Sequence, residues 1–329
     1  MAMESAPPIS EYAPFGAGAF GVSRRSFAAS DEARGRAFPV DLWQPAGDTG
    51  ARCPLVVFVH GSGGNRRSAA YLCSHLASHG YLVAAMDHSE VVAADLAPTA
   101  DETAEQRAAR VDAIIASRVP DVRFLLDTLL DGGARGGAGA VGVDAARIGL
   151  AGHSFGGWTV LAVPEQDARI RAVVAMGPGG NSNPLPGILP LRLTFDWEND
   201  IGVLYLAAAD DVPIPLGAVA ELFGRTPGRR RMFVLRRADH QHFLDDVEGE
   251  HEALRAMTLP GDAAWIPAAM VPMSELCSGA QAHDFVRGLT LAHLDATLRQ
   301  SDAAERFLAC GAAAALAAQG VDAAEYSGC

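Results

Sequence analysis

The chain has 329 residues, of which 49% are hydrophobic and 20% are charged. This balance is typical of a globular protein and excludes a disordered or fibrous chain. The 26 Lys and Arg residues are all arginines, which excludes chemistry that needs a lysine, such as Schiff-base formation. The net charge of −13 without basic blocks makes nucleic acid an unsuitable partner.

The sequence gives no sign of a membrane or an exported protein. It contains no run of about 20 apolar residues that could span a bilayer. The N-terminus has no basic segment followed by an apolar one, so we see no signal peptide and expect a cytoplasmic protein without a membrane partner.

The five cysteines are odd in number and lack the spacing of metal ligands, so we expect no metal site and reduced thiols. A disulfide between two of them, Cys277 and Cys310, is left open. The five are Cys53, Cys73, Cys277, Cys310 and Cys329.

Predicted strands and helices alternate along the chain. Residues 1–17, rich in Pro, Ala and Gly, predict an N-terminal arm. Apolar or alternating runs predict strands at residues 20–27, 38–42, 54–59, 81–86, 147–151, 170–176, 203–208 and 232–235. Helical periodicity predicts helices at residues 66–79, 103–130 (interrupted at Pro120), 155–162, 216–223 and from 281 to about 318. We therefore predict an α/β fold with a mostly parallel central sheet and helices on both faces, in a single domain over residues 18–329.

The segment RIGLAGHSFGG, residues 147–157, contains the pattern Gly-x-Ser-x-Gly between a predicted strand and a predicted helix. Such a turn holds the serine at its apex in a strained conformation, and the flanking glycines leave room for the sharp reversal. This context predicts that Ser154 is a nucleophile.

A serine nucleophile needs N–H donors for the oxyanion of its intermediate. The backbone N–H of Phe155 is the first candidate, because it follows the nucleophile at the start of a helix. The second should lie in a loop after an earlier strand. The loop HGSGG, residues 60–64, follows the buried strand PLVVFV, and we assign the donor to the N–H of Ser62.

An acid and a base should follow the serine in that order along the chain. The strand at residues 203–208 is followed by Asp210 and Asp211, and we favour Asp211, four residues before Pro215, with Asp210 as the alternative. The last predicted strand is followed by two histidines, and we favour His240 over His242 as the base.

Three other histidines, His60, His88 and His153, lie near these motifs. We expect them to shape loops around the site.

Four segments now carry a family resemblance: PLVVFVHGSGG, LASHGYLVAAMDH, GHSFGG and HQHFLDD. They resemble serine esterases of the α/β-hydrolase superfamily, in particular the platelet-activating-factor acetylhydrolase-like and dienelactone-hydrolase-like group. The resemblance runs over residues 54–246 and implies an α/β-hydrolase fold with Ser154 as nucleophile. His240 fits the H-Q-x-F-x-D pattern of the group. These motifs are specific for fold and nucleophile, and much less so for substrate.

The sequence departs from the eukaryotic acetylhydrolases at one position. Those enzymes place their acid just after the strand that follows the nucleophile, and here that segment reads AVVAMGPGGN, with no carboxylate. The acid must come from the next strand, as in polyester hydrolases, which supports Asp211 and weakens the inference of a phospholipid substrate. Dienelactone hydrolases use a cysteine nucleophile, so Ser154 argues against that activity.

These residues predict a carboxylic ester hydrolase that forms an acyl-enzyme and needs no cofactor. We expect neutral small-molecule esters with short to medium chains, including aromatic and polyester-type esters. The alternatives on the same fold are an acetylhydrolase-like phospholipase, a thioesterase or a peptidase, and, more remotely, an inactive binding protein. The oligomeric state is not indicated.

Apolar residues in the Pro-rich connection at residues 181–200 are candidate walls of the substrate site. They are Leu185, Ile188, Leu189 and Trp197. Residues 257–273, with Trp265, are a candidate second cover.

Overall fold

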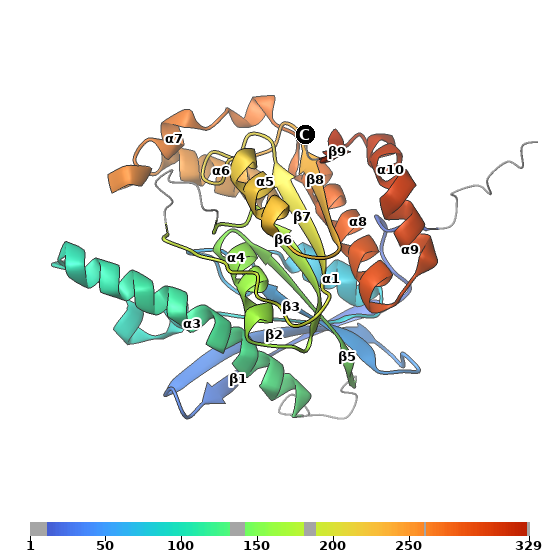
Figure 1. Cartoon of the computed structure of the whole chain (residues 1–329), viewed down its shortest axis with the longest axis horizontal. Coiled ribbons are helices and arrows are strands. Elements are labelled where there is room, and N and C mark those ends of the chain that lie inside the picture. Colours follow the sequence, from blue (N-terminus) through green and yellow to red (C-terminus); the bar gives the residue numbers. More distant parts are fainter. Residues whose placement is uncertain (1–11, 132–141, 181–188, 260, 328–329) are drawn as a thin grey trace, which may run out of the picture.

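The protein is described here from a computed structural model, over residues 12–131, 142–180, 189–259 and 261–327 (Figure 1). One sheet holds the nine described strands. These are β1 Gly21–Asp31, β2 Arg36–Ala46, β3 Cys53–Val59, β4 Leu82–Met86, β5 Val143–His153, β6 Ile170–Met176, β7 Gly202–Ala208, β8 Arg230–Leu235 and β9 Ala323–Glu325.

The described α-helices pack on this sheet or on one another. They are α1 Ala70–Ser78, α2 Ser89–Val92, α3 Ala104–Leu130, α4 Phe155–Ala162, α5 Leu216–Arg225, α6 Val247–Ala256, α7 Ile266–Ala269, α8 Gly279–Leu298, α9 Asp302–Arg306 and α10 Ala312–Ala318. Short turns lie at η1 Ala94–Leu96, η2 Val163–Glu165, η3 His240–Phe243, η4 Gly261–Ala263 and η5 Met273–Glu275, and η6 Phe307–Gly311 is a π-helix. None of the described helices is long and apolar enough to cross a membrane.

The strand order is β1-β2-β4-β3-β5-β6-β7-β8-β9. The six strands from β4 to β8 in this order run parallel, while β1, β2 and β9 pair antiparallel at the two edges. Parallel strands end on the same side, so the loops after β3, β5, β7 and β8 gather at one edge of the sheet. Ser62, Ser154, Asp211 and His240 follow these four strands in that order.

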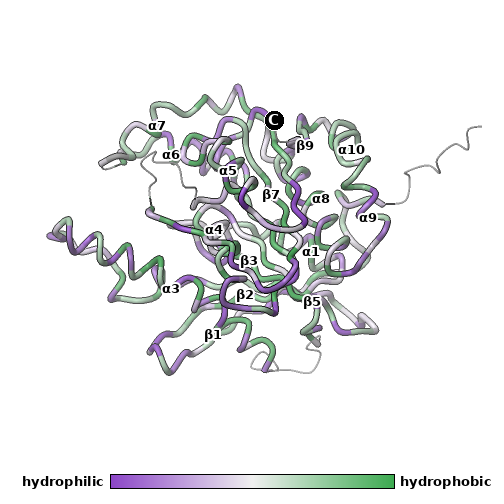
Figure 2. The backbone as a smooth tube through the Cα atoms, viewed as in Figure 1, coloured by the Kyte–Doolittle hydropathy of each residue, from purple (hydrophilic) through white to green (hydrophobic). Residues whose placement is uncertain are grey.

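Each face of the sheet has its own hydrophobic core, and Figure 2 shows the hydrophobic central strands. Side chains from α3, α4 and α5 fill one core, and side chains from α1, α8 and α10 fill the other. Alternate residues of β3 enter opposite cores: Leu55 and Val57 enter the first, and Val56 and Phe58 the second. This two-sided burial explains the unbroken apolar run of β3.

The structure corrects some of the predicted elements. Helix α3 runs unbroken for 27 residues through Pro120. Pro120 and Ala116 are exposed, so the carbonyl that loses its intrahelical partner lies on the solvent side of the helix. Strand β9 and helix α6 were not predicted, and the C-terminal helical region is broken after α8, where Gln300 has a φ of 54°.

The structure also shows whether Cys277 and Cys310 form a disulfide. Cys277 and Cys310 are both free thiols, the first buried and the second exposed, so they form no disulfide. Cys53 and Cys73 are also free and buried, and Cys329 lies outside the described residues.

Residues 12–17, the described part of the predicted arm, lie against the C-terminal helices. The Tyr12 hydroxyl donates to Asp295 on α8 at 2.7 Å, and the Phe15 ring packs edge-on against Phe307 with centroids 6.0 Å apart. Residues 1–11 lie outside the described part of the chain.

Candidate active site

Ser154 lies at a sharp turn between β5 and α4. Its φ of 58° and ψ of −118° are strained values for a residue with a side chain. A Cβ on Gly152 would lie 2.4 Å from the carbonyl oxygen of Gly156, and a Cβ on Gly156 would lie 2.0 Å from that of Val59. Only glycine fits at either position, which gives the physical reason for the Gly-x-Ser-x-Gly spacing.

Backbone hydrogen bonds fix this turn to the sheet and the helix. The Ser154 N–H donates to the Met176 carbonyl at the end of β6, at 2.9 Å. The Ser154 carbonyl accepts from the N–H of Trp158 in the first turn of α4, at 3.0 Å. The strained serine is thus held between two rigid elements.

Asp211, after β7, and His240, after β8, form a buried pair. The Asp211 Oδ2 lies 2.7 Å from the His240 Nδ1, and the Asp211 Oδ1 accepts from the Ile214 N–H at 2.7 Å. Each carboxylate oxygen therefore has a donor, which fixes the carboxylate and the imidazole together. Burial lowers the pKa of His240, but the Asp211 carboxylate raises it more, and the net pKa lies above the ordinary value.

The competing residues lie in different surroundings. The His242 Nδ1 lies 2.7 Å from Asp239 Oδ1, and its Nε2 lies 3.1 Å from the Cys277 carbonyl oxygen, so both ring nitrogens have structural partners. Asp210 is half-buried, whereas Asp211 is buried. The structure thus brings Asp211 and His240 together and places His242 elsewhere.

The Asp211–His240 pair lies against two residues near the serine in the structure, His153 and Gly177. The ring of His153, the neighbour of Ser154, lies with its centroid 4.5 Å from that of His240. A Cβ on Gly177, which follows β6, would lie 3.3 Å from Asp211 Oδ2 and 3.5 Å from His240 Nδ1. Burial lowers the pKa of His153 far below its ordinary value, so its ring is neutral against His240.

The two predicted oxyanion donors lie beside Ser154. Phe155 is the first residue of α4, whose first N–H groups have no partner within the helix. The loop at residues 60–64 packs against the serine, since a Cβ on Gly61 would lie 3.1 Å from the Ser154 Cβ. Within the described residues, no hydrogen bond from the Ser62 N–H is found.

His60 and His88 are buried behind this loop. The His60 Nε2 accepts from the His88 N–H at 3.2 Å, so its Nδ1 carries the proton and donates to the Gly61 carbonyl at 2.7 Å. Burial lowers the pKa of both rings, and each is neutral. The His60 ring thus fixes the Gly61 carbonyl, and the His88 N–H fixes the His60 ring.

A further cluster, which the sequence did not predict, surrounds the turn that carries His240. Asp239 binds two histidines: its Oδ1 contacts His242, and its Oδ2 lies 2.5 Å from the Nδ1 of His251 on α6. All three side chains are buried. The cluster ties η3 to α6 and so fixes the backbone on both sides of His240.

The predicted substrate walls are described only in part. Leu185 and Ile188 lie outside the described residues. Trp197 is half-buried, packs edge-on against Phe195 and donates to the Leu161 carbonyl at 3.3 Å. Trp265 is 53% exposed. A substrate contact for Trp197 stays a prediction.

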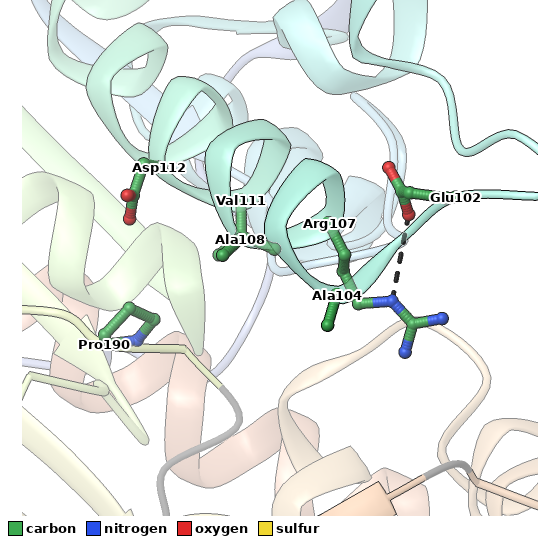
Figure 3. Close-up of a pocket in the computed structure, with 7 residues that line it drawn as sticks. All are labelled: Glu102, Ala104, Arg107, Ala108, Val111, Asp112 and Pro190. Carbon is green, nitrogen blue, oxygen red and sulfur yellow. Dashed lines mark ion pairs between the residues drawn. The ribbon is translucent and has the colours of Figure 1, made fainter.

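A cavity of about 500 Å³ lies between the N-terminal half of α3 and Pro190 (Figure 3). Leu191, the next residue, approaches the predicted site, because a Cβ on Gly179 would lie 2.9 Å from its Cδ1. The Gly179 N–H in turn donates to the Ser154 carbonyl at 3.4 Å. The cavity is not lined by Ser154, Asp211 or His240. Its lining residues are Glu102, Ala104, Arg107, Ala108, Val111, Asp112 and Pro190.

Comparisons with known proteins identify the fold. A ferulic acid esterase from Streptomyces cinnamoneus superposes with a TM-score of 0.59 over 88% of this chain and 93% of that one, at 23% sequence identity. The chain has the α/β-hydrolase fold. The strand order and the mostly parallel sheet agree with it, so the predicted fold class is confirmed.

Sequence comparisons point to one group of esterases. The family model described as platelet-activating factor acetylhydrolase, isoform II, matches residues 37–119. The chain is similar to the platelet-activating factor acetylhydrolase of Cavia porcellus, with 26% identity over 62% of this chain and 51% of the relative. The enzymes of Bos taurus and Canis lupus familiaris are 25% and 27% identical over 41% of this chain and 37% of each relative. The predicted resemblance is confirmed. The chain spans about half, or less, of the length of these relatives.

Proposed function

We propose that the protein is a carboxylic ester hydrolase whose triad is Ser154, His240 and Asp211. The observation that carries this proposal is the buried Asp211–His240 contact of 2.7 Å beside a serine held at a φ of 58°. The similarity to proteins named acetylhydrolases supports hydrolysis of an acyl group as the reaction class.

The reaction follows from the position of each group. His240, oriented by Asp211 through Nδ1, takes the proton of the Ser154 hydroxyl on Nε2 while Ser154 Oγ attacks the ester carbonyl. The N–H groups of Ser62 and Phe155 stabilise the oxyanion. His240 then gives its proton to the leaving alcohol, and a water molecule, activated by the same ring, cleaves the acyl-enzyme.

We infer that the substrates are neutral esters with short to medium acyl chains, including aromatic esters. The half-buried apolar side chains of Leu191 and Ile214, which approach Gly179 after β6, support this class. The names of the relatives favour a second candidate, an acetyl ester of a phospholipid. Against it stands the segment after β6, Gly177 to Gly180, where the acetylhydrolases carry their acid and this chain has no carboxylate.

The decisive experiment combines labelling with substitution. A fluorophosphonate probe should modify Ser154, and Ser154→Ala should lower kcat on p-nitrophenyl acetate by about 10⁴-fold or more without changing the melting temperature appreciably. Ser274→Ala, at an exposed serine in η5, is the matched control and should behave as the wild type. Labelling at another serine, or retained activity in Ser154→Ala, contradicts the proposal.

A further inference from the structure

Arg118 is the largest fully buried side chain of the described chain. It lies in the middle of α3, on the face that also carries Val122, Leu125 and Leu129 into the core. Burying a charged group costs several kcal/mol unless partners offset the loss of water. The contacts of Arg118 therefore indicate what this burial achieves.

The guanidinium of Arg118 binds the backbone of the predicted oxyanion loop. Its Nη1 donates to the His60 carbonyl at 2.8 Å, and its Nη2 donates to the Gly61 carbonyl at 3.4 Å. Glu90, after the end of β4, forms an ion pair with Nη2 and supplies the opposite charge. The planar guanidinium of an arginine can donate from two nitrogens to two neighbouring carbonyls. The ammonium group of a lysine has a single nitrogen and cannot reproduce this geometry.

The bond to Gly61 controls the direction of the oxyanion donor. The Gly61 carbonyl and the Ser62 N–H belong to one planar, trans peptide group, so they point in opposite directions. Three donors hold this carbonyl away from the solvent: Arg118, the His60 Nδ1 at 2.7 Å and the Gly64 N–H at 3.2 Å. The Ser62 N–H is thereby directed to the other side of the loop.

The same guanidinium also contacts the residue that carries the second donor. The Arg118 Cζ lies 4.1 Å from the centroid of the Phe155 ring, within the range of a cation–π contact. One side chain thus contacts both the Gly61 carbonyl, which shares a peptide group with the Ser62 N–H, and the ring of Phe155.

The far end of the loop is fixed separately. The Arg66 N–H donates to Asp87 Oδ1 at 2.8 Å, and the Arg67 Nε donates to Asp41 Oδ2 at 2.7 Å. Arg118 secures the beginning of the loop and these hydrogen bonds secure its end, so residues 62–64 lie between two anchored points.

We propose that Arg118 is a positioning residue that sets the relative orientation of the Ser62 and Phe155 N–H groups; this inference rests on the proposed esterase function. Arg118 does not touch the reacting atoms. Its effect is therefore confined to the transition state, where the oxyanion forms, and ground-state binding of the ester is unaffected.

The test uses two variants and a control. Arg118→Met with Glu90→Gln removes both buried charges together, so that neither is left unpaired. Arg118→Lys keeps the positive charge beside Glu90 but loses the two guanidinium nitrogens that donate to the His60 and Gly61 carbonyls. Arg123→Met, at an exposed residue of the same helix paired with Asp167 at 3.9 Å, is the matched control.

Three measurements decide the inference: kcat and KM on p-nitrophenyl butyrate, the inhibition constant of a trifluoromethyl ketone that forms a tetrahedral adduct, and amide hydrogen exchange of the loop. In the double variant and in Arg118→Lys we expect kcat to fall about 10- to 100-fold with KM within about twofold of the wild type, because a displaced donor costs less than the 10²–10³-fold of a removed one. Ketone binding should weaken in parallel, and exchange at residues 60–64 should become faster. The control should change none of these.

The outcomes separate this inference from the function on which it rests. A variant with wild-type kcat and wild-type loop exchange overturns the role of Arg118, as does a change confined to KM. If the double variant does not fold, Arg118→Lys alone decides between these outcomes. If the wild type shows no hydrolysis that depends on Ser154, the proposed function fails, and unchanged loop exchange in the variants would then reject the positioning role independently.

Discussion

The two candidate bases, His240 and His242, have different hydrogen-bond partners. His240 faces Asp211, while His242, two residues later, has both ring nitrogens occupied by Asp239 and the Cys277 carbonyl. Because a base needs a nitrogen free to take a proton from the nucleophile, this arrangement favours His240 as the proposed base.

The paired substitutions test this assignment. His240→Ala should lower kcat by about 10⁴-fold, and Asp211→Asn should have an effect of similar size, because only the true acid fixes the tautomer of the imidazole. His242→Ala and Asp210→Asn are the matched controls and should keep most of the activity of the fraction that folds. Steady-state kinetics with p-nitrophenyl acetate gives the result. A reversed order within either pair would move the role to the neighbouring residue.

The pKa of His240 predicts the dependence of activity on pH. The base must be neutral to accept the proton of Ser154, and Asp211 raises its pKa above the ordinary value of about 6.5. Activity should therefore rise with pH through a midpoint above about pH 6.5 and be lost as the pH falls below it. Asp211→Asn should move the midpoint of the residual activity to lower pH. A midpoint of kcat/KM below 6.5 in the wild type would contradict the charge coupling.

Sequence patterns found some of these residues and missed others for a physical reason. Ser154 stands in a spacing that only a strained turn requires, so the pattern predicts its conformation. No comparable pattern marks Arg118. Most arginines in helices are exposed to solvent, so an arginine in a helical sequence does not by itself predict a buried side chain. The one available signal was its helical register with Val122, Leu125 and Leu129, which places it on the apolar face. The partners of Asp239 were also out of reach, since His251 comes from a helix that was not predicted.

Among the elements, the turn η3 depends most on its surroundings. Burial lowers the pKa of His242, but the carboxylate of Asp239 and the Cys277 carbonyl outweigh this and raise it to about 9. The ring bridges Asp239 to the segment before α8. The element that carries the proposed base is held by its own Asp–His contact, separate from the one between Asp211 and His240.

The turn at Ser154 depends on glycine, and a substitution can measure this. Gly156→Ala should destabilise the protein by about 3 kcal/mol or more, because the new Cβ would lie 2.0 Å from the Val59 carbonyl oxygen and one of the two backbones must move. Gly217→Ala in α5 is the matched control: no heavy atom lies within 4 Å of its Cβ position, and the change should be neutral or stabilising by up to about 1 kcal/mol. Denaturant midpoints give both values. Equal effects of the two substitutions would contradict the steric argument.

The elements that the sequence predicted well are those buried on both faces. β6 matches its prediction at both ends, and β3 begins one residue before it, because unbroken apolar runs mark such strands clearly. The elements that were missed depend on tertiary contacts. β9 is three residues long and exists by pairing with β8, and α6 is a mixed sequence capped by Asp246. Local pattern carries little information about either.

At the scale of the whole molecule, charge and surface favour small neutral substrates. The net charge of −13 repels anionic lipid surfaces. In the proposed function the substrate must reach Ser154 at the edge of the sheet where the parallel strands have their C-terminal ends. A dissolved ester can diffuse there directly, whereas a phospholipid has to leave its bilayer.

A series of p-nitrophenyl esters from acetate to palmitate tests this preference. Each methylene buried in an apolar pocket contributes about 0.8 kcal/mol, so kcat/KM should rise over the first few carbons. Once the pocket is full, further carbons remain exposed or clash, and kcat/KM should fall sharply. Ser154→Ala, measured with every ester, corrects for uncatalysed hydrolysis. Vesicles of a phospholipid with a short acyl chain form the second arm of the experiment. A preference for palmitate, or faster turnover of the phospholipid than of the butyrate ester, would reject this substrate class and favour a lipase or an acetylhydrolase acting on phospholipid.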